Sequence, residues 1–361
     1  MAYISFQPTD YFNTKLYTAN GSTNAITGVG FQPDFTWIKK RSNTSAHYFF
    51  DSLRTTYSVS SNTAAAQADQ SGQGFTSLDS DGFTLSGTGG GGGVNDGTNT
   101  FASWNWKGGT TSVPSGGSIT PSAVSINTTS KQGIYKWTGN GSAGATIAHG
   151  LGQAPKFIMV KNTGGSHDWA CYHANIDTAD LTQAGDYFIR LNTTAAKVDN
   201  SGYFNDTTTT DTLITLGADN PVNQSSTEII MYAFCDVPGY SHSGTYMGNA
   251  NVDGRFIYLG FEPAMLMIKR SDGTGGWCMY DDKRPVTAPG PGWYNVNQDF
   301  IQAQDIGSES DNSNLALDFL SNGFKLRNSA GDTNTNGGNF IYIAWAKNPI
   351  VGSNETPGLA R

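Results

Sequence analysis

The residues of this chain best suited to chemistry are two pairs of neighbouring aspartates. Asp79 and Asp81 stand in the stretch LDSDGF, and Asp281 and Asp282 follow the aromatic stretch WCMY. Two carboxyl groups roughly 5–9 Å apart can hydrolyse a glycoside, one as the acid and the other as nucleophile or base. A polysaccharide depolymerase is therefore one function to weigh.

The carboxylate pairing does not recur where the surrounding sequence does. Asp318, in LDFLSNGF, matches Asp79 but has no second acid in its spacer, and Asp199 is followed by Asn200. Because Asp and Asn side chains commonly cap tight turns, turn capping is the favoured interpretation. DSDG also lacks the later ligands of an EF-hand loop, although a looser structural calcium site in these loops stays open.

Two glycine-rich stretches resemble phosphate-binding loops. GNGSAG, with Gly139, Gly141 and Gly144, fits G-x-G-x-x-G, but no helix and no acidic residue about 20 positions on follow it. GTGGGGG at 87–93 lacks the Gly-Lys-Ser/Thr of a P-loop. We interpret the first as a turn and the second as a flexible hairpin loop.

Histidine, cysteine and serine provide no further catalytic pattern. The five histidines form no H-E-x-x-H motif, and no G-x-S-x-G elbow is present. The odd set of Cys171, Cys235 and Cys278 contains no C-x-x-C pair, which predicts buried, reduced thiols. We therefore predict a protein that is not an enzyme and has no bound cofactor.

Four aromatic residues lie in loop-like contexts and could contact a receptor or partner, for example by stacking on sugars: Trp169, Trp277, Trp293 and Tyr294. The competing interpretation is that each packs in a core or between modules, which is the commoner use of such side chains.

Composition narrows the class of protein further. Of 361 residues, 45 are glycine and only 14% are charged, while 12% are aromatic, which favours a folded all-β chain with long polar loops. The net charge of −8 argues against nucleic-acid binding and against attraction to anionic membranes. No apolar run approaches 18 residues and the start shows no signal-peptide pattern, so we expect neither membrane insertion nor secretion.

The elements that would position these residues come from one unit used three times. Three segments open with a tyrosine (Tyr17, Tyr135, Tyr246) and an Asn/Gly turn, then continue with a proline and a strand ending in lysine. The proline and lysine are six residues apart each time: Pro33 and Lys39, Pro155 and Lys161, Pro263 and Lys269. A Gly-aromatic strand follows in each, at Gly82, Gly202 and Gly323, and then a closing apolar strand. A period of about a domain's length indicates tandem modules.

We predict three tandem antiparallel β-sandwich-like modules with long polar loops. The only helix candidates are 62–69 and 178–186. The expected organisation is an N-terminal arm (1–16), module 1 (17–107), an extended Gly/Ser/Pro-rich linker (108–133), module 2 (134–240), module 3 (241–349) and a C-terminal tail (350–361).

The stretches NTKLYTANGSTNAITGVGFQPDFTWIKKRS (13–42), SLDSDGFTLSG (77–87) and SWNWKGG (103–109) resemble the repeat module of structural proteins in tailed bacteriophages, particularly marine and cyanobacterial ones. The resemblance extends to 258–284 and 317–332. It implies a virion or tail-fibre protein and carries no catalytic residues with it.

The expected function is therefore that of a non-enzymatic virion protein on the tail, made in the host cytoplasm and contacting the host surface. The alternatives are a capsid decoration or head-fibre protein and, less favoured, a depolymerase. The expected partners are other virion proteins, further copies of the chain in a trimer, and a host surface glycan or protein.

Overall fold

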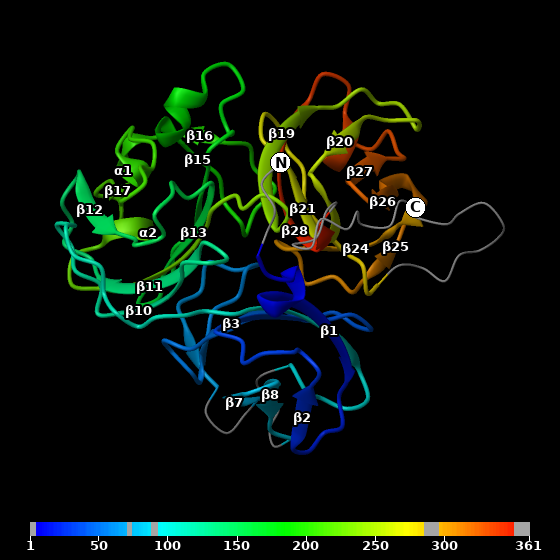
Figure 1. Ribbon diagram of the computed structural model, residues 1–361, viewed down its shortest axis with the longest axis horizontal. Helices are drawn as coiled ribbons and strands as arrows, with labels where there is room; N and C mark the ends of the chain where they lie inside the picture. Colours follow the sequence, from blue (N-terminus) through cyan, green and yellow to red (C-terminus); the bar gives the residue numbers. More distant parts are fainter. Residues whose placement is uncertain (1–4, 71–73, 88–92, 285–295, 350–361) are drawn as a thin grey trace.

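The all-β prediction is confirmed by a computed structural model of the chain, which describes residues 5–70, 74–87, 93–284 and 296–349. Its strands form three lobes around a common centre (Figure 1). Each lobe has a main sheet facing the centre and a smaller sheet on the outside. All the strand pairs within these sheets are antiparallel, as in a β-sandwich.

Lobe 1 (residues 12–106) has a four-stranded main sheet in the order β1 (Phe12–Thr18), β9 (Thr100–Trp106), β3 (Phe35–Lys40), β4 (His47–Asp51). Its outer sheet has the order β2 (Asn24–Thr27), β8 (Gly82–Leu85), β7 (Phe75–Asp79), and β5 (Tyr57–Ser58) pairs with β6 (Ala68–Asp69).

Lobe 2 (residues 123–234) has the main-sheet order β10 (Ala123–Asn127), β11 (Gln132–Thr138), β18 (Glu228–Phe234), β13 (Phe157–Asn162), β14 (Ala170–His173). Its outer pair is β12 (Ala145–Ala148) with β17 (Leu213–Leu216), and β15 (Tyr187–Phe188) pairs with β16 (Val198–Asp199).

Lobe 3 (residues 241–349) has the main-sheet order β19 (Ser241–Met247), β28 (Asn339–Pro349), β21 (Phe261–Arg270), β22 (Trp277–Asp281), β24 (Asp299–Gln302), β25 (Ser310–Asp311). Its outer sheet has the order β20 (Phe256–Tyr258), β27 (Gly323–Leu326), β26 (Leu317–Leu320), β23 (Val296–Asn297).

The helices of the described residues are short, namely η1 (Pro8–Asp10), η2 (Leu181–Asp186), η3 (Ser313–Leu315), α1 (Ser201–Phe204), α2 (Asn220–Asn223) and α3 (Gly331–Asn334). The stretch 178–186 thus contains the predicted helical structure, as two short turns that meet at a kink at Gln183. The stretch 62–69 contains none and ends in strand β6.

The same chain path recurs in the three main sheets. In lobes 1 and 3 the first strand pairs with the last, the last with the second, and the second with the third. In lobe 2, β11 takes the place of the first strand, and β10 is an additional strand at its edge. Successive residues of a strand point to opposite faces of the sheet, so a main sheet can contribute to two cores, one on each face. In β3, Phe35 and Trp37 belong to the central core, whereas Ile38 belongs to the core between the two sheets of lobe 1. All six residues of β3 are therefore buried.

Three sequence predictions on local structure are wrong. The linker 108–133 is packed, since β10 forms within it and Val124 and Ile126 join the central core. Gly202 lies in the helical turn α1, where the Asn200 side chain accepts a hydrogen bond from its N–H, and the equivalent strand is β17. Pro263 lies inside β21 at a register shift, where a bulge tolerates its missing N–H.

The predicted N-terminal arm is shorter than expected, because β1 begins at Phe12. The C-terminal tail, 350–361, lies outside the described residues. The remaining predicted domain bounds stay predictions.

Candidate functional site

Three aromatic rings, one from each lobe, meet at the centre of the molecule. Trp106 on β9, Phe234 on β18 and Trp345 on β28 occupy equivalent places in the last main strand of their lobes. The ring centroids are 6.0 Å apart for Trp106 and Phe234, 5.1 Å for Trp106 and Trp345, and 5.3 Å for Phe234 and Trp345. Each pair is thus in the range where aromatic contacts stabilise beyond area burial.

Around this centre, each lobe inserts a buried lysine toward its neighbour. The three are the strand-ending lysines of the repeat, Lys39, Lys161 and Lys269, and all are fully buried. Each donates a hydrogen bond to a backbone carbonyl of another lobe: Lys39 to Ile306 (2.9 Å), Lys161 to Ala64 (2.7 Å), Lys269 to Thr194 (3.3 Å). Lobe 1 thus reaches lobe 3, lobe 2 reaches lobe 1, and lobe 3 reaches lobe 2, which closes a ring.

The same lysines each donate to a second carbonyl within their own lobe: Ser45, His167 and Arg270. Burial lowers the pKa of all three to about 8, with nearby aspartates opposing the shift only in part. A neutral amine still has two N–H groups, so loss of the proton leaves both contacts possible.

A second ring of contacts starts at the beginning of β4, β14 and β22, where Trp169 directly precedes β14 and His47 and Trp277 are the first residues of the other two strands. Trp169 Nε1 donates to the carbonyl of Ser60 (2.8 Å), and Trp277 Nε1 donates to that of Arg190 (2.9 Å). His47 holds the equivalent place in lobe 1, with its Nε2 3.1 Å from the carbonyl of Gln302. Burial lowers the pKa of His47 well below its usual value, which favours the neutral ring.

These positions correct one interpretation of the sequence. Trp169 and Trp277 are 0% and 2% exposed, so neither contacts a receptor, and packing between modules is their role. The other two candidates, Trp293 and Tyr294, lie outside the described residues.

A third ring of contacts starts from equivalent positions later in the same strands, which hold a buried ion pair in lobes 1 and 3. Here lobe 1 contacts lobe 2, lobe 2 contacts lobe 3, and lobe 3 contacts lobe 1, which is the reverse of the order in the first two rings. In lobe 1, Asp51 pairs with Arg54 and accepts a hydrogen bond from Tyr232 of lobe 2 (2.7 Å). In lobe 3, Asp281 pairs with Arg284 at 2.5 Å and accepts from Trp104 Nε1 of lobe 1 (2.9 Å).

Lobe 2 has His173 at the place of these aspartates, with its Nε2 3.0 Å from the carbonyl of Tyr342 in lobe 3. The signal for the ion pairs is the D-x-x-R spacing shared by HYFFDSLR and WCMYDDKR. Sequence reasoning considered Asp281 only as part of a carboxylate pair and did not connect it with Arg284.

The other predicted carboxylate pair has a structural role. Asp79 accepts hydrogen bonds from Ser77 Oγ and Thr84 Oγ1, which braces the β7–β8 hairpin. Asp81 accepts from the N–H groups of Gly28 and Gly30, and these bonds lower its pKa. Both carboxylates thus have structural partners, but these are hydroxyl groups and the N–H groups of the loop after β2, and not the N–H groups of the hairpin turn that the capping interpretation expected.

GNGSAG is likewise a turn, with Gly141 and Gly144 at φ of 69° and 77° between β11 and β12. Most of GTGGGGG lies outside the described residues.

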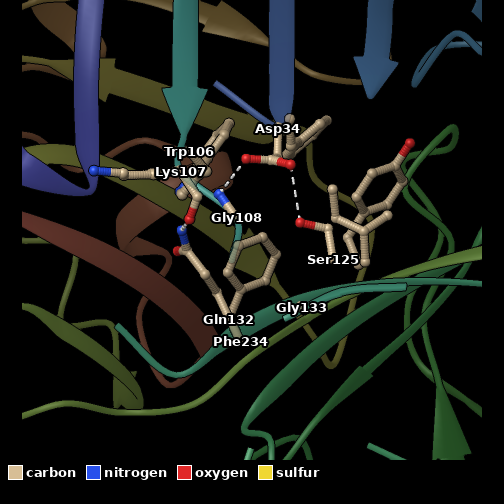
Figure 2. A pocket seen from close by; sticks show the side chains of 11 residues that line it. Asp34, Trp106, Lys107, Gly108, Ser125, Gln132, Gly133 and Phe234 are labelled. Atoms are coloured by element: carbon tan, nitrogen blue, oxygen red, sulfur yellow. Dashed lines mark hydrogen bonds between the residues drawn. The ribbon is translucent and has the colours of Figure 1, made fainter. Parts of the chain in front are cut away.

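A small cavity of about 10 Å³, partly open to solvent, lies between lobes 1 and 2. Figure 2 shows the Asp34 carboxylate on its wall, bound to the N–H of Gly108 (2.8 Å) and to Ser125 Oγ (2.9 Å). This is about the space that one water molecule needs and far below the usual range of small-molecule sites, roughly 300–1,000 Å³. The two hydrogen bonds of Asp34 instead hold Gly108 and Ser125, both in the stretch predicted as a linker, against lobe 1.

Other chemistry-bearing groups are equally enclosed. Cys171, Cys235 and Cys278 are buried and unbridged, and burial raises the pKa of each thiol. Within the described ranges, no cluster of three or more His, Cys, Asp or Glu side chains could hold a metal ion. No helix in the same part of the chain is long and apolar enough to cross a membrane.

Comparison with known proteins yields one match. The model of a family described as a domain of unknown function (DUF7483) matches residues 7–349. No curated protein and no solved structure matches the chain.

The buried lysines predict an unusual pH dependence of stability. With a pKa of about 8 folded and an ordinary value near 10.5 unfolded, the unfolded state binds more protons between these limits. Stability from this group should therefore rise with pH in that window. Replacing Lys161 with Met should destabilise the protein by about 1–2 kcal/mol more at pH 9.5 than at pH 7.5, measured by urea unfolding.

Lys283→Met is the matched control, because that side chain is 43% exposed and pairs only with a neighbouring aspartate. Its effect should be small at both pH values. An equal effect of Lys161→Met at the two pH values would contradict the assignment.

Proposed function

The chain belongs to the DUF7483 family, and we propose that it is a non-enzymatic structural protein of a tailed-phage particle, carried on the tail, where it contacts the host surface. The proposal of a tailed-phage particle rests on the resemblance of the repeated stretches to structural proteins of tailed bacteriophages. The observation that carries the non-enzymatic part is the enclosure of its reactive groups.

Catalysis needs acids, bases or nucleophiles that a substrate can reach. Here several buried titratable groups take part in the contacts within and between the lobes. Lys161 donates to carbonyls of two lobes, His47 contacts a carbonyl of lobe 3, and Asp281 pairs with Arg284 in the interior. Such groups strengthen a ring of lobes and are closed to a polymer chain.

The surface fits a particle protein. Low charge and polar loops keep the chain soluble, while the lobes cover the inner faces of one another's main sheets. Weak contacts of such a body with a host surface add up when many copies act together. This makes high copy number, and not single-site affinity, the source of attachment.

One observation favours a second candidate, a capsid decoration protein. The threefold repetition of lobes within one chain would suit a position of threefold or local threefold symmetry on a capsid. A homotrimer stays a prediction in either case, and it would have to form through the outer surfaces of the lobes.

Location on the particle distinguishes the two candidates. Antibody labelling of purified virions, read by electron microscopy, should place the protein on the tail. Label distributed over the head would replace host attachment with capsid decoration, and absence from the particle would contradict both.

Asp281 provides the test of the non-enzymatic assignment. Purified wild-type protein should release no reducing sugar from host capsular polysaccharide. Asp281→Asn should lower the free energy of unfolding by about 3 kcal/mol, because Arg284 loses its buried partner.

Asp96→Asn is the control for this stability change. Asp96 is half exposed and pairs with Lys40, so its loss should have an effect of less than about 1 kcal/mol. Sugar release by wild type that Asp281→Asn abolishes would establish an enzyme instead.

A further inference from the structure

We propose that the outward face of strand β20 in lobe 3 binds a neutral, hexose-containing saccharide through the side chains of Phe256 and Tyr258. The inference rests on the proposed host-contact function and names the class of partner. Neither residue was singled out by the sequence reasoning.

Phe256 and Tyr258 are large aromatic residues on the solvent side of their sheet. Their exposures are 44% and 59%, while Ile257 between them is 8% exposed and packs in the lobe core. Residues two apart on a strand point to the same side. Gly323 pairs with Tyr258, and a Cβ at Gly323 would lie 3.1 Å from the Phe256 ring, so no side chain separates the rings at this position.

The other lobes serve as an internal comparison. Ile26 in lobe 1 and Ile147 in lobe 2 are the buried equivalents of Ile257, on strands that pair in the same way. The flanking positions there have small side chains: Ala25, Thr27, Thr146 and Ala148. The fold therefore does not require aromatic residues at this place, and lobe 3 alone has them.

The neighbouring strands add polar groups of both signs. Lys325 lies directly across from Phe256, and Asp318 lies across from Lys325. Asp253 bridges Lys325 (2.7 Å) and Arg327 (3.0 Å), and Arg327 also pairs with Asp318 (2.6 Å). The Asp253 side chain is 73% exposed, so it is open to a ligand.

This combination fits a sugar better than other partners. Beside the rings, two acids (Asp253 and Asp318) are paired with two bases (Lys325 and Arg327), and the exposed Arg255 next to Phe256 makes a third base. The surface therefore offers donors and acceptors with a net charge of only about +1. Adjacent strands are about 4.8 Å apart, so the groups on β20, β27 and β26 span about 10 Å across the sheet, which suits a short oligosaccharide better than a single hexose. An aromatic face takes the C–H face of a sugar, while paired carboxylates and guanidinium groups take its hydroxyls.

The main competitor is a protein strand that adds to the sheet edge, since β20 is an edge strand. At three residues, β20 offers only a short template for such pairing, which natural proteins use to block edge association. We therefore commit to the saccharide and leave strand addition as an outcome of the test.

The test uses the full chain on a printed array of bacterial surface polysaccharides and neutral hexose oligosaccharides, together with cell-binding measurements. Wild type should bind at least one neutral glycan. The double variant Phe256→Ala/Tyr258→Ala should bind it at least about tenfold more weakly, since two stacking contacts are lost. Tyr258→Phe should keep most of the affinity because the ring remains.

Tyr57→Ala is the matched control, because Tyr57 is 39% exposed on lobe 1, and it should bind as wild type does. All variants should have the thermal midpoint of wild type, since the changed side chains are at the surface.

The outcomes separate this inference from the proposed function. Cell binding that persists in the double variant, with no glycan binding by wild type, overturns the saccharide inference and leaves host contact standing. Binding to neither cells nor glycans overturns both. Cell binding that the double variant loses while protease treatment of the cells abolishes wild-type binding identifies a protein partner and also overturns the saccharide.

Discussion

The contact of Trp106, Phe234 and Trp345 at the centre is the constraint on which the rest of the structure depends. Three large rings can meet only if the main sheets of all three lobes turn the same face inward. That face is then closed to water, so every polar group near it needs a partner. The lysines, the indole N–H groups of Trp169 and Trp277, and the bonds that Tyr232 and Trp104 donate to the buried aspartates supply partners across the boundaries between lobes, whereas each Asp–Arg pair lies within one lobe. The indole N–H groups of Trp106 and Trp345 are buried without a hydrogen-bond partner among the described residues.

The same constraint gives the inner and outer faces of the lobes different roles. Because the inner faces hold the ring together, binding to other molecules is left to the outer sheets and loops. The outer sheets tolerate different side chains at equivalent places, as Thr27 and Tyr258 show, because no neighbouring lobe covers them. A chain of three related lobes can thus keep one framework and specialise one lobe for contact, without the requirement that all three copies change together.

The sequence predicted the all-β class, the β7–β8 hairpin and the recurrence of Lys39, Lys161 and Lys269, since these depend on local patterns. It did not predict that the lobes would share a core. Trp169 and Trp277 looked like loop aromatics because their hydrogen-bond partners, Ser60 and Arg190, are about 90 to 110 positions away in the chain. Sequence reasoning also missed the packing of Val124 and Ile126, because they lie in a Gly/Ser-rich stretch and the core that they join is shared with other lobes. Phe256 and Tyr258 stood out only once Ala25 and Thr27 could be aligned with them by strand pairing.

The central claim is that the three lobes fold as one unit around this shared core. Differential scanning calorimetry tests it most directly, through the ratio of the calorimetric to the van't Hoff enthalpy of unfolding. A shared core predicts a single transition with a ratio near one. Separate transitions, or a ratio near three, would show that the lobes unfold independently and would contradict the account.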